Sequence, residues 1–496
     1  MPPPTPQPTP DPCSFIEELR WRGLLHQCTD EAGLAAHLKS GVRRAYIGYD
    51  PTADSLTIGN LVTIMMLVHF QRHGHSPVVV MGGGTGLIGD PSGKSAERML
   101  MTEEMVNANV ESQKRIFGRL LDFSGTRANA ATIVNNANWL TKLGYLEILR
   151  DVGKHFSVNE MVKKDSVRNR LEARDQGISY TEFSYMVLQS YDFLHLFKAN
   201  GVTLQMGGSD QWGNIVGGID LIERWARTRA TAFCENHASP KELDALALIA
   251  DAMRKDQPHA SRTALLLEAF QAKVGMRPGL TDLPTGESFG LTAPLVTKAD
   301  GGKFGKTESG AVWLTAERTS PFDYYQFWLN TADADVGRFL RVFTLLSRAE
   351  IEDIEAAHAE EPGARFAQKS LARAATLLLH GEAALREAES RTAALFARPG
   401  EGDAAAALDA MLAKPPDSVN PITMLDGPGA AIADLLVHTK VASSKREARE
   451  WLAAGAISLN GAPVAPDKLV TRSDLHAGKL LAIRRGKKTW HGAVFS

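Results

Sequence analysis

The fold is decided by residues 44–81, RAYIGYDPTADSLTIGNLVTIMMLVHFQRHGHSPVVVM. A short apolar strand ends at Tyr49 and a turn follows it. The apolar pattern from Leu56 to Phe70 then predicts a long helix, with Asp54 or Ser55 as its N-cap. The stretch closes with a second buried strand, PVVVM. A strand, a helix and a strand in this order favour a parallel sheet.

The same alternation continues on both sides of this stretch. Two amphipathic helices are predicted between Phe15 and Lys39, and further strands around residues 132–134, 202–205 and 291–295. Strands that alternate with helices predict the α/β class, with a Rossmann-like parallel sheet covered on both faces. Ligands of such sheets bind beyond the carboxyl ends of the strands.

Composition shifts predict five parts. They are a disordered Pro-rich tail (1–13), a sheet domain (14–320) with a helical insertion (223–288), an α-helical domain (321–398), a linker (399–430) and a small α+β module (431–496). The last part carries eleven Lys or Arg against five Asp or Glu. This local excess of positive charge indicates a small basic terminal module.

The whole chain has 496 residues, of which 44% are apolar and 23% charged, as is typical of a globular protein. Its 55 basic and 57 acidic residues nearly balance, so any surface for nucleic acid has to be local. Three cysteines are too few and too scattered for a disulfide framework. No apolar run is long enough to span a bilayer, so we expect a cytoplasmic protein without a membrane partner.

The glycine-rich segment after the second strand matches a dinucleotide-binding pattern only loosely. Gly84 to Gly89 has the spacing G-x-G-x-x-G, but Gly89 leads into another turn and not into a helix. Gly93-Lys94-Ser95 resembles the end of a P-loop, yet Ile88 stands where the first glycine is required. A nicotinamide-dependent oxidoreductase is therefore disfavoured.

A polar stripe on an apolar helix is more informative. Tyr185, Gln189 and Asp192 lie at i, i+4 and i+7, and so share one face. Such a stripe either faces water or lines a polar pocket. The next strand offers a second cluster, Gln205-Met206-Gly207-Gly208-Ser209-Asp210-Gln211, where glycines let a ligand approach the backbone and a carboxylate and an amide follow.

Five segments, in order and approximate spacing, resemble the bacterial tyrosyl-tRNA synthetases. They are Tyr46 to Leu56, Gly86 to Lys94, Tyr185 to Asp192, Gly207 to Asn214 and Lys303 to Thr307. Near the C-terminus, Ser443 to Arg449 and Gly455 to Gly461 resemble the S4 RNA-binding fold. The likeness runs from about Phe15 to the C-terminus, apart from the predicted insertion.

The resemblance implies a ligase that makes tyrosyl-adenylate from L-tyrosine and ATP, and then transfers the tyrosyl group to tRNA(Tyr). ATP with Mg²⁺ would be a substrate, with no tightly bound cofactor and no dedicated metal ligands. A homodimer is implied by the family and not by any visible interface. Catalysis in such a reaction consists of positioning the substrates and stabilising charge on phosphorus and pyrophosphate.

The resemblance also assigns site residues. Tyr46 and Asp192 would bind the phenolic hydroxyl of the substrate; Asp90, Tyr185 and Gln189 would bind its ammonium group, and Gln211 its carboxyl end. ATP would be held by Asp50, Gly59, Gly208, Asp210 and Lys306, and its phosphates by Thr52, Thr57, Asn60, Lys303, Lys306 and Thr307. Asn135 or Asn136, ahead of Trp139, is a weaker assignment near the site.

One departure from the family pattern concerns phosphate binding. The first hallmark normally begins with His, whereas this chain has Thr57-Ile58-Gly59-Asn60. Asn60 is an accepted form that offers an amide donor. Thr57 keeps a neutral hydroxyl but loses the reach and possible charge of imidazole. A catalytically attenuated RNA-binding paralogue is thus an alternative. A tryptophan-specific relative is disfavoured, because tryptophan lacks the hydroxyl that Tyr46 and Asp192 would bind.

Two basic clusters are candidate tRNA contacts. One lies just before the polar helix and consists of Lys163, Lys164, Arg168 and Arg170. The other lies in the C-terminal module and consists of Lys445, Arg446, Arg449, Arg484, Arg485, Lys487 and Lys488. Such groups bind phosphates without reading sequence, and either cluster could instead be a solvated face.

Overall fold

The computed structural model describes residues 14–88, 101–162, 167–168, 179–256, 261–302, 304–307, 310–396, 408, 418–486 and 489–496. The chain separates into two compact units, the first ending at Gly381 and the second beginning at Glu382. The predicted N-terminal tail lies outside the described residues. The five-part division of the chain stays a prediction.

The described residues of the first unit form a six-stranded sheet in the order β1-β6-β5-β2-β3-β4. The strands are β1 (Gln27–Cys28), β2 (Arg44–Tyr49), β3 (Ser76–Met81), β4 (Thr132–Asn135), β5 (Val202–Gly208) and β6 (Phe289–Ala293). Neighbouring strands from β2 to β6 run parallel, and β1 pairs antiparallel with β6. The predicted α/β class is therefore confirmed. The edge strand β1 was not predicted, because it is too short to show a period.

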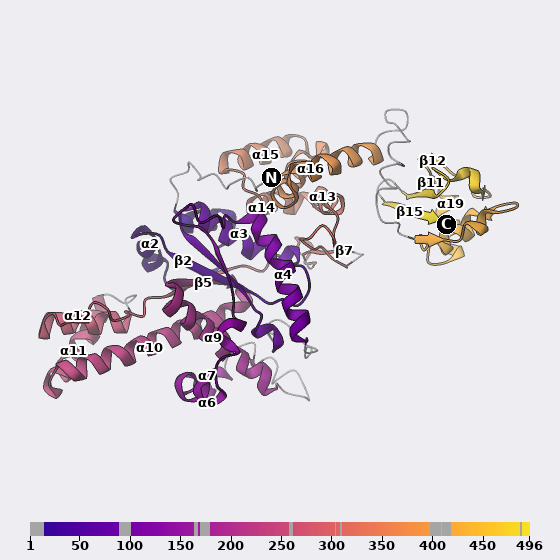
Figure 1. Ribbon diagram of the computed structural model, residues 1–496. Coiled ribbons are helices and arrows are strands. Elements are labelled where there is room, and N and C mark those ends of the chain that lie inside the picture. Colours follow the sequence, from indigo (N-terminus) through magenta and orange to yellow (C-terminus); the bar gives the residue numbers. More distant parts are fainter. Residues whose placement is uncertain are drawn as a thin grey trace. The chain divides into compact units, whose positions relative to one another are not determined.

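Helices cover both faces of this sheet (Figure 1). They are α3 (Ile58–Arg72) and α4 (Glu103–Leu120) on one face, and α9 (Tyr180–Asn200) and α10 (Trp212–His237) on the other. Side chains of strand β2 contact the helices on both faces of the sheet, because successive side chains of a strand point in opposite directions. Tyr46 packs against Phe193 of α9 at 5.4 Å, and Tyr49 packs against Phe117 of α4 at 4.9 Å between ring centroids.

Helix α3 begins at Ile58 with Thr57 as its N-cap, so the predicted start at Leu56 and the predicted cap were wrong. The physical reason is that the residues before α3 are extended and paired with a distant segment. Ile58 N donates to Val312 O at 2.9 Å, and the carbonyl of Leu56 accepts from Leu314 N at 2.9 Å. Both residues predicted as caps are engaged elsewhere. Ser55 Oγ accepts from Thr315 N, and Asp54 pairs with Arg318.

The segment predicted as an insertion is helical. Helix α10 runs without a break through residue 223 and is followed by α11 (Pro240–Asp256) and α12 (Arg262–Val274). In Figure 1 these two helices lie beside each other and beyond the sheet. With the C-terminal half of α10 they form a separate apolar core, which includes Cys234 of α10, Leu246 of α11 and Phe270 of α12. Hydrophobic contacts among these helices therefore hold this part of the chain together.

Further helices come before and after the strands of the sheet in the chain. They are α1 (Phe15–Arg22), α2 (Glu31–Lys39), α13 (Pro321–Leu329), α14 (Asp333–Phe343), α15 (Arg348–Glu360) and α16 (Phe366–Phe396). Helix α16 contains non-helical backbone at Gly381, with φ 82° and ψ 174°. Shorter helices follow β4, namely α5 (Ala137–Leu140), α6 (Tyr145–Glu147) and α7 (Val158–Met161).

A buried arginine ties the first helix to the end of α14. The Arg22 side chain is 2% exposed and lies 2.6 Å from the carboxylate of Glu18. Its guanidinium also donates to the carbonyls of Arg341, Thr344 and Leu346 at 2.8, 3.0 and 2.8 Å. A helix leaves its last carbonyls without partners, so Arg22 caps α14 across 319 residues of sequence.

The second unit is a small α+β module. Its five-stranded sheet has the order β12-β11-β14-β15-β9 among the described residues. The strands are β9 (Ser418–Asn420), β11 (Ile457–Leu459), β12 (Ala462–Pro463), β14 (Leu480–Arg485) and β15 (Thr489–Phe495), and β10 (Ala430–Ala431) pairs with β13 (Leu469–Val470). Helices α18 (Ile432–His438) and α19 (Lys445–Ala453) pack on the sheet through Leu436, Leu452 and Ile483. Across the described parts of both units, no helix has the length and apolar character needed to cross a bilayer.

Candidate functional site

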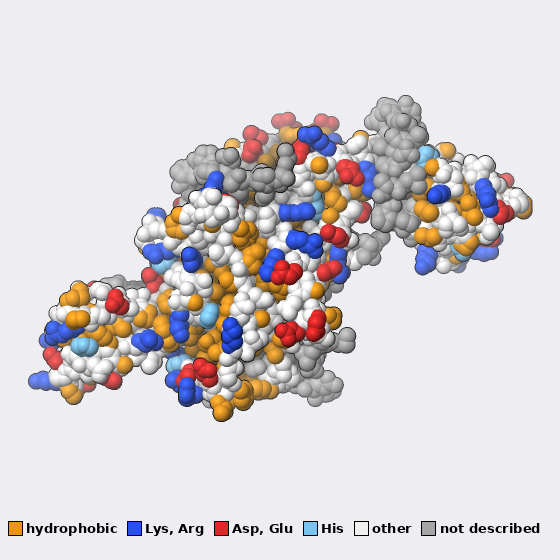
Figure 2. Space-filling view, in the orientation of Figure 1, with side chains coloured by type: hydrophobic (Ala, Val, Ile, Leu, Met, Phe, Trp, Pro, Cys, Tyr) orange, Lys and Arg blue, Asp and Glu red, His pale blue; other side chains and the backbone are white. Residues whose placement is uncertain are grey.

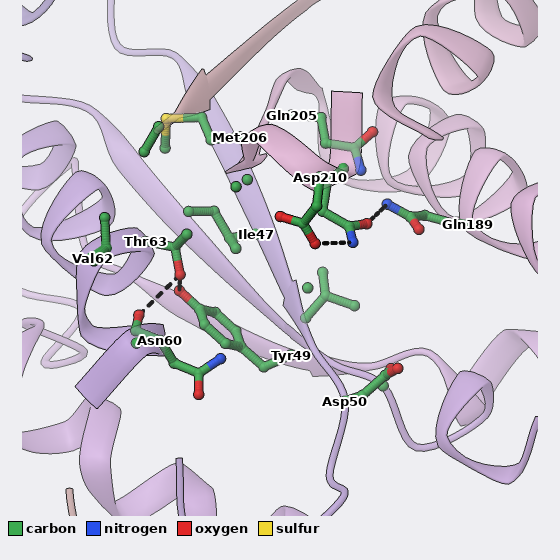
Figure 3. A pocket seen from close by; sticks show the side chains of 18 of the residues that line it. Ile47, Tyr49, Asp50, Asn60, Val62, Thr63, Gln189, Gln205, Met206 and Asp210 are labelled. Carbon is green, nitrogen blue, oxygen red and sulfur yellow. Dashed lines mark hydrogen bonds between the residues drawn. The ribbon is translucent and has the colours of Figure 1, made fainter. Parts of the chain in front are cut away.

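A cavity of about 540 Å³ opens at the carboxyl ends of β2, β3, β5 and β6. Figure 3 shows Tyr49, Asn60 and Thr63 on one side of it, and Gln189 and Asp210 on the other. This edge is where ligands bind in open parallel sheets. The cavity brings together the predicted residues Tyr46, Asp50, Thr52, Thr57, Gly59, Asn60, Tyr185, Gln189, Asp192, Gly208, Asp210 and Gln211.

Two buried polar groups, Tyr46 and Asp192, define one part of the cavity. Tyr46 is 2% exposed, and its hydroxyl has no hydrogen-bond partner among the residues that the structure describes. Desolvation, and secondly the charge of Asp192, raises the pKa of this hydroxyl well above its usual value. The hydroxyl therefore keeps its proton. A buried donor without a partner is costly, so this group is suited to a ligand.

The carboxylate of Asp192 is held by two donors from the segment after β4. Trp139 Nε1 donates to one oxygen at 2.7 Å, and Asn136 Nδ2 donates to the other at 2.9 Å. Burial raises the pKa of Asp192 to about 7, against the lowering effect of these donors. A carboxylate offers about four acceptor positions, so Asp192 has capacity left for a ligand hydroxyl.

A chain of hydrogen bonds links Asp192 to Asp50 at the end of β2. Asn136 Nδ2 also lies 3.0 Å from Thr85 Oγ1, and Thr85 donates to Asp50 Oδ1 at 2.9 Å. The hydroxyl of Tyr185 donates to the other oxygen of Asp50 at 3.1 Å. The glycines after β3 make this approach possible, because a Cβ on Gly82 would lie 2.3 Å from Asp50 Oδ1. The glycine run thus serves close packing within the site.

The opposite wall is a set of amides and one carboxylate. Gln189 Nε2 donates to Gln211 Oε1 at 3.2 Å, and Gln211 Nε2 donates to Asp210 Oδ2 at 3.1 Å. Asn214 Nδ2 donates to Gln189 Oε1 at 2.9 Å. Figure 3 marks the contacts that run from Gln189 toward Asp210. This wall offers acceptors suited to an ammonium group or to ribose hydroxyls.

The start of α3 forms the third part of the cavity. Thr52, Thr57, Gly59 and Asn60 line it there, at the positive end of the helix. The hairpin β7 (Lys306–Thr307) and β8 (Gly310–Ala311) follows Gly305, whose backbone has φ 76°. A Cβ on Gly305 would lie 2.5 Å from Ile58 Cγ2, so the hairpin and the start of α3 are close neighbours. A helix N-terminus attracts phosphate.

Several predicted residues lie outside the described part of the chain. They are Asp90, Lys163, Lys164, Arg170, Lys303, Lys487 and Lys488. The backbone of Lys306 and Thr307 is described as β7, whereas Arg168 belongs to a short described segment. The predicted roles of these residues stay predictions.

The structure divides the predicted basic cluster of the second unit between two faces. Arg485 lies over the ring of Trp451 at 4.7 Å, and Arg484 lies over the ring of Trp490 at 5.3 Å. Successive residues of a strand point to opposite faces, so these two arginines cannot share one surface. Arg485 is on the side of α19, which also carries Lys445, Arg446 and Arg449.

The polar residues Tyr49, Thr63, Thr85 and Gln205 also line the cavity, and sequence reasoning gave none of them a role in the site. Gln205 is buried in β5 and its Oε1 has no partner within the described structure. A single amide in an otherwise apolar strand was a signal that could have identified it. Thr85 was read only as part of a glycine-rich turn, because its contact with Asp50 depends on two strands meeting at one edge.

A polar cavity at the carboxyl edge of a parallel sheet, beside a helix N-terminus, is typical of α/β proteins that bind nucleotides. Residues 39–243 and 256–397 match the family model described as tRNA synthetases class I (W and Y). Residues 417–492 match the Tyrosine--tRNA ligase SYY-like C-terminal domain. The chain therefore belongs to the class I tRNA synthetases of this tryptophan and tyrosine family.

Comparison with individual relatives supports the same family assignment. The chain is 43% identical to a Tyrosine--tRNA ligase of Roseiflexus castenholzii over 484 residues, which covers 96% of this chain and 98% of the relative. It is 43% identical to that of Geobacillus kaustophilus, again with 96% and 98% covered. Among solved structures, a C-terminally truncated mitochondrial tyrosyl-tRNA synthetase of Aspergillus nidulans is 28% identical, with a TM-score of 0.60, and the match covers 77% of this chain and 94% of that one.

Proposed function

We propose that this chain activates L-tyrosine with ATP and then ligates the tyrosyl group to the 3′ end of tRNA(Tyr). The observation that carries the proposal is the unpartnered hydroxyl of Tyr46 in the same buried cavity as Asp192. A phenolic hydroxyl accepts from Tyr46 and donates to Asp192. Phenylalanine does neither, and an indole N–H cannot accept, so both would leave buried polar groups unpaired.

The amide wall positions the amino acid. Tyr185 and Gln189, with Asp90, bind the ammonium group, and Gln211 lies beside Gln189 to orient the carboxyl end. The acceptor oxygens on this wall support the assignment. With the phenol and the ammonium group both fixed, the substrate carboxylate is directed toward the nucleotide, which lowers the entropic cost of the reaction.

ATP occupies the remainder of the cavity. Gly208 and Asp210 hold the ribose, Asp50 and Gly59 contact the nucleotide, and the phosphates bind Thr52, Asn60 and the loop of Lys303, Lys306 and Thr307. The tyrosine carboxylate attacks the α-phosphorus and pyrophosphate leaves, with no protein nucleophile. Lysine ammoniums and the α3 N-terminus stabilise the charge that develops on pyrophosphate. Mg²⁺ enters as the companion of ATP.

The second unit binds tRNA(Tyr) through the basic face of α19. Lys445, Arg446, Arg449 and Arg485 supply the positive charge there, and Lys487 and Lys488 follow Arg485 in the chain. Arg484 contributes from the other face of the sheet. Contacts to phosphate position the RNA without reading its sequence. In this proposal the protein acts in the cytoplasm.

The test is tyrosine-dependent exchange of labelled pyrophosphate into ATP, followed by charging of tRNA(Tyr). We expect exchange with tyrosine and little with phenylalanine or tryptophan. Exchange driven by tryptophan would reassign the substrate. Binding of tRNA without any exchange would favour the attenuated RNA-binding paralogue.

The ionisation of Asp192 predicts a pH dependence for tyrosine activation. Because burial raises the pKa of Asp192 to about 7, the carboxyl is largely protonated below that pH and accepts the substrate hydroxyl poorly. The value of kcat/KM for tyrosine in pyrophosphate exchange should therefore rise as pH increases through about 7 and level off above it. Trp139→Phe removes a donor that lowers this pKa, so it should move the midpoint to higher pH. A profile that is flat in both proteins between about pH 6 and 8 would contradict this role of Asp192.

We propose that two copies of the chain form a homodimer through an apolar surface near α6 and α7. Leu146 is 79% exposed there, beside the exposed side chains of Tyr145, Leu149, Val158 and Tyr180. Tyr145 and Tyr180 lie 3.4 Å apart between hydroxyls, and Figure 2 shows hydrophobic side chains gathered over this end of the first unit. Exposed apolar patches mark interaction sites.

We expect Leu146→Arg to shift the protein from dimer to monomer in analytical ultracentrifugation. Burying a charge at an apolar interface costs several kcal/mol. Leu248→Arg is the control, since Leu248 is 73% exposed on α11 and away from this surface. Equal dimerisation of both variants would mean that another surface joins the subunits.

A further inference from the structure

The N-cap of α3 and the third residue of the same helix are joined by two hydrogen bonds at the cavity. Thr57 N donates to Asn60 Oδ1 at 3.0 Å, and Thr57 Oγ1 donates to the same oxygen at 3.0 Å. Both residues line the cavity. The pairing therefore lies at the site and not on a remote part of the helix.

These two donors fix the orientation of the Asn60 amide. A backbone N–H can only donate, so the atom that faces Thr57 N has to be the amide oxygen. The amide nitrogen must then point away from Thr57. Figure 3 shows the nitrogen of Asn60 nearer than its oxygen to the middle of the cavity. Within the described part of the chain this nitrogen makes no hydrogen bond, so it is available to a ligand oxygen.

The same bonds decide what Thr57 can do. A hydroxyl has one proton, and Thr57 spends it on Asn60 Oδ1. What Thr57 Oγ1 can present to the cavity is lone pairs, which repel the oxygens of a phosphate. A direct bond from Thr57 to phosphate would require breaking the bond that orients Asn60. Thr57 can therefore either donate to phosphate, as the sequence predicts, or donate to Asn60 Oδ1, as the structure shows, but not both at once.

The backbone holds Thr57 in place for this purpose. Leu56 and Ile58 pair with Leu314 and Val312 on either side of it, and Thr57 itself forms a bridge with Trp313. Val312 N in turn donates to Gly305 O at 2.9 Å. Thr57 is therefore anchored through the main chain, and its side chain is free to act on Asn60.

We propose that Thr57 is a positioning residue that orients the Asn60 amide nitrogen toward the phosphates of ATP, and that it makes no phosphate contact of its own. The inference rests on the proposed function, because it needs ATP in this cavity. In this chain the Thr57 and Asn60 pair supplies one directed donor at the position where the family hallmark begins with histidine.

The experiment is a double-mutant cycle on the full-length chain, read as kcat and KM for ATP in tyrosine-dependent pyrophosphate exchange. Thr57→Val removes the hydroxyl and keeps the shape, and should lower kcat about threefold to tenfold with little change in KM for tyrosine. Thr57→Ser restores the hydroxyl and should stay within about twofold of the parent. Asn60→Ala should cost more, and adding Thr57→Val to it should have no further effect.

Each outcome is decisive. Additive losses in the double variant would mean that Thr57 contacts phosphate itself, and parental activity of Thr57→Val would remove Thr57 from the mechanism. Thermal unfolding of every variant separates these results from misfolding. If Thr57 had only a structural role, Thr57→Val would lower Tm, and kcat would not differ between Thr57→Val and Thr57→Ser. A parent with no tyrosine-dependent exchange would instead overturn the proposed function and this inference with it.

Discussion

Replacing Asp192 by alanine should lower kcat/KM for tyrosine in pyrophosphate exchange by about 150-fold or more. The substrate loses a hydrogen bond to a charged group, and the donors of Trp139 and Asn136 are left unpaired in a buried site. Together these effects cost about 3 kcal/mol or more. Because phenylalanine has no hydroxyl to lose, its weak activation should change little, and the preference for tyrosine should shrink by the same factor.

Asp251→Ala is the matched control. It removes a carboxylate from an exposed position on α11, outside the cavity, and should leave both substrates unaffected. An Asp192→Ala protein that keeps the parental preference for tyrosine would refute the phenol-binding role of this residue. Binding of tyrosine measured by calorimetry should weaken in parallel, which distinguishes a lost contact from a slower chemical step.

Ending the chain after residue 396 should separate the two steps of the reaction. The truncated protein keeps the cavity and all of α16, so exchange should stay within about twofold of the parent. Charging of tRNA(Tyr) should fall by about 10²-fold or more in kcat/KM, because the basic module and its phosphate contacts are gone. Equal loss of both steps would contradict a separate role for the second unit in binding RNA.

A point variant makes the same test in the complete chain. Arg449→Glu places a negative charge on the exposed face of α19, and should weaken charging and flatten its salt dependence. Arg386→Glu is the control, since Arg386 is exposed and already paired with Glu382. A variant that charges tRNA as well as this control, at every salt concentration, would exclude Arg449 from the interface.

Three strands of the first unit were predictable because each contains a short run of apolar residues, whereas the two-residue strand β1 was not. β2, β3 and β5 lie close to where the sequence places them. The start of α3 was not predictable, because it depends on the pairing of Leu56 and Ile58 with a segment that comes more than 250 residues later. Capping rules consider only residues near the end of the helix, so they cannot predict such a contact.

The candidate site divides in the same way. The stripe of Tyr185, Gln189 and Asp192 follows from helical geometry, and all three line the cavity. The contact of Thr85 with Asp50 and the anchoring of Asp192 by Trp139 join different strands and helices. The bond between Thr57 and Asn60 is local in sequence, yet which amide atom it engages is decided by the backbone N–H of Thr57.

The cap that Arg22 places on α14 has a consequence for how the protein is made. Helix α1 is eight residues long, which is too short to be stable alone in water. Its guanidinium partners are synthesised 319 or more residues later, which corresponds to roughly 16–64 s at common rates of translation. During that interval Glu18 and Arg22 cannot be buried, because the residues that cover them in the folded protein have not been synthesised. Nascent chains that leave the ribosome should therefore expose this first helix to chaperones until the chain has passed Leu346.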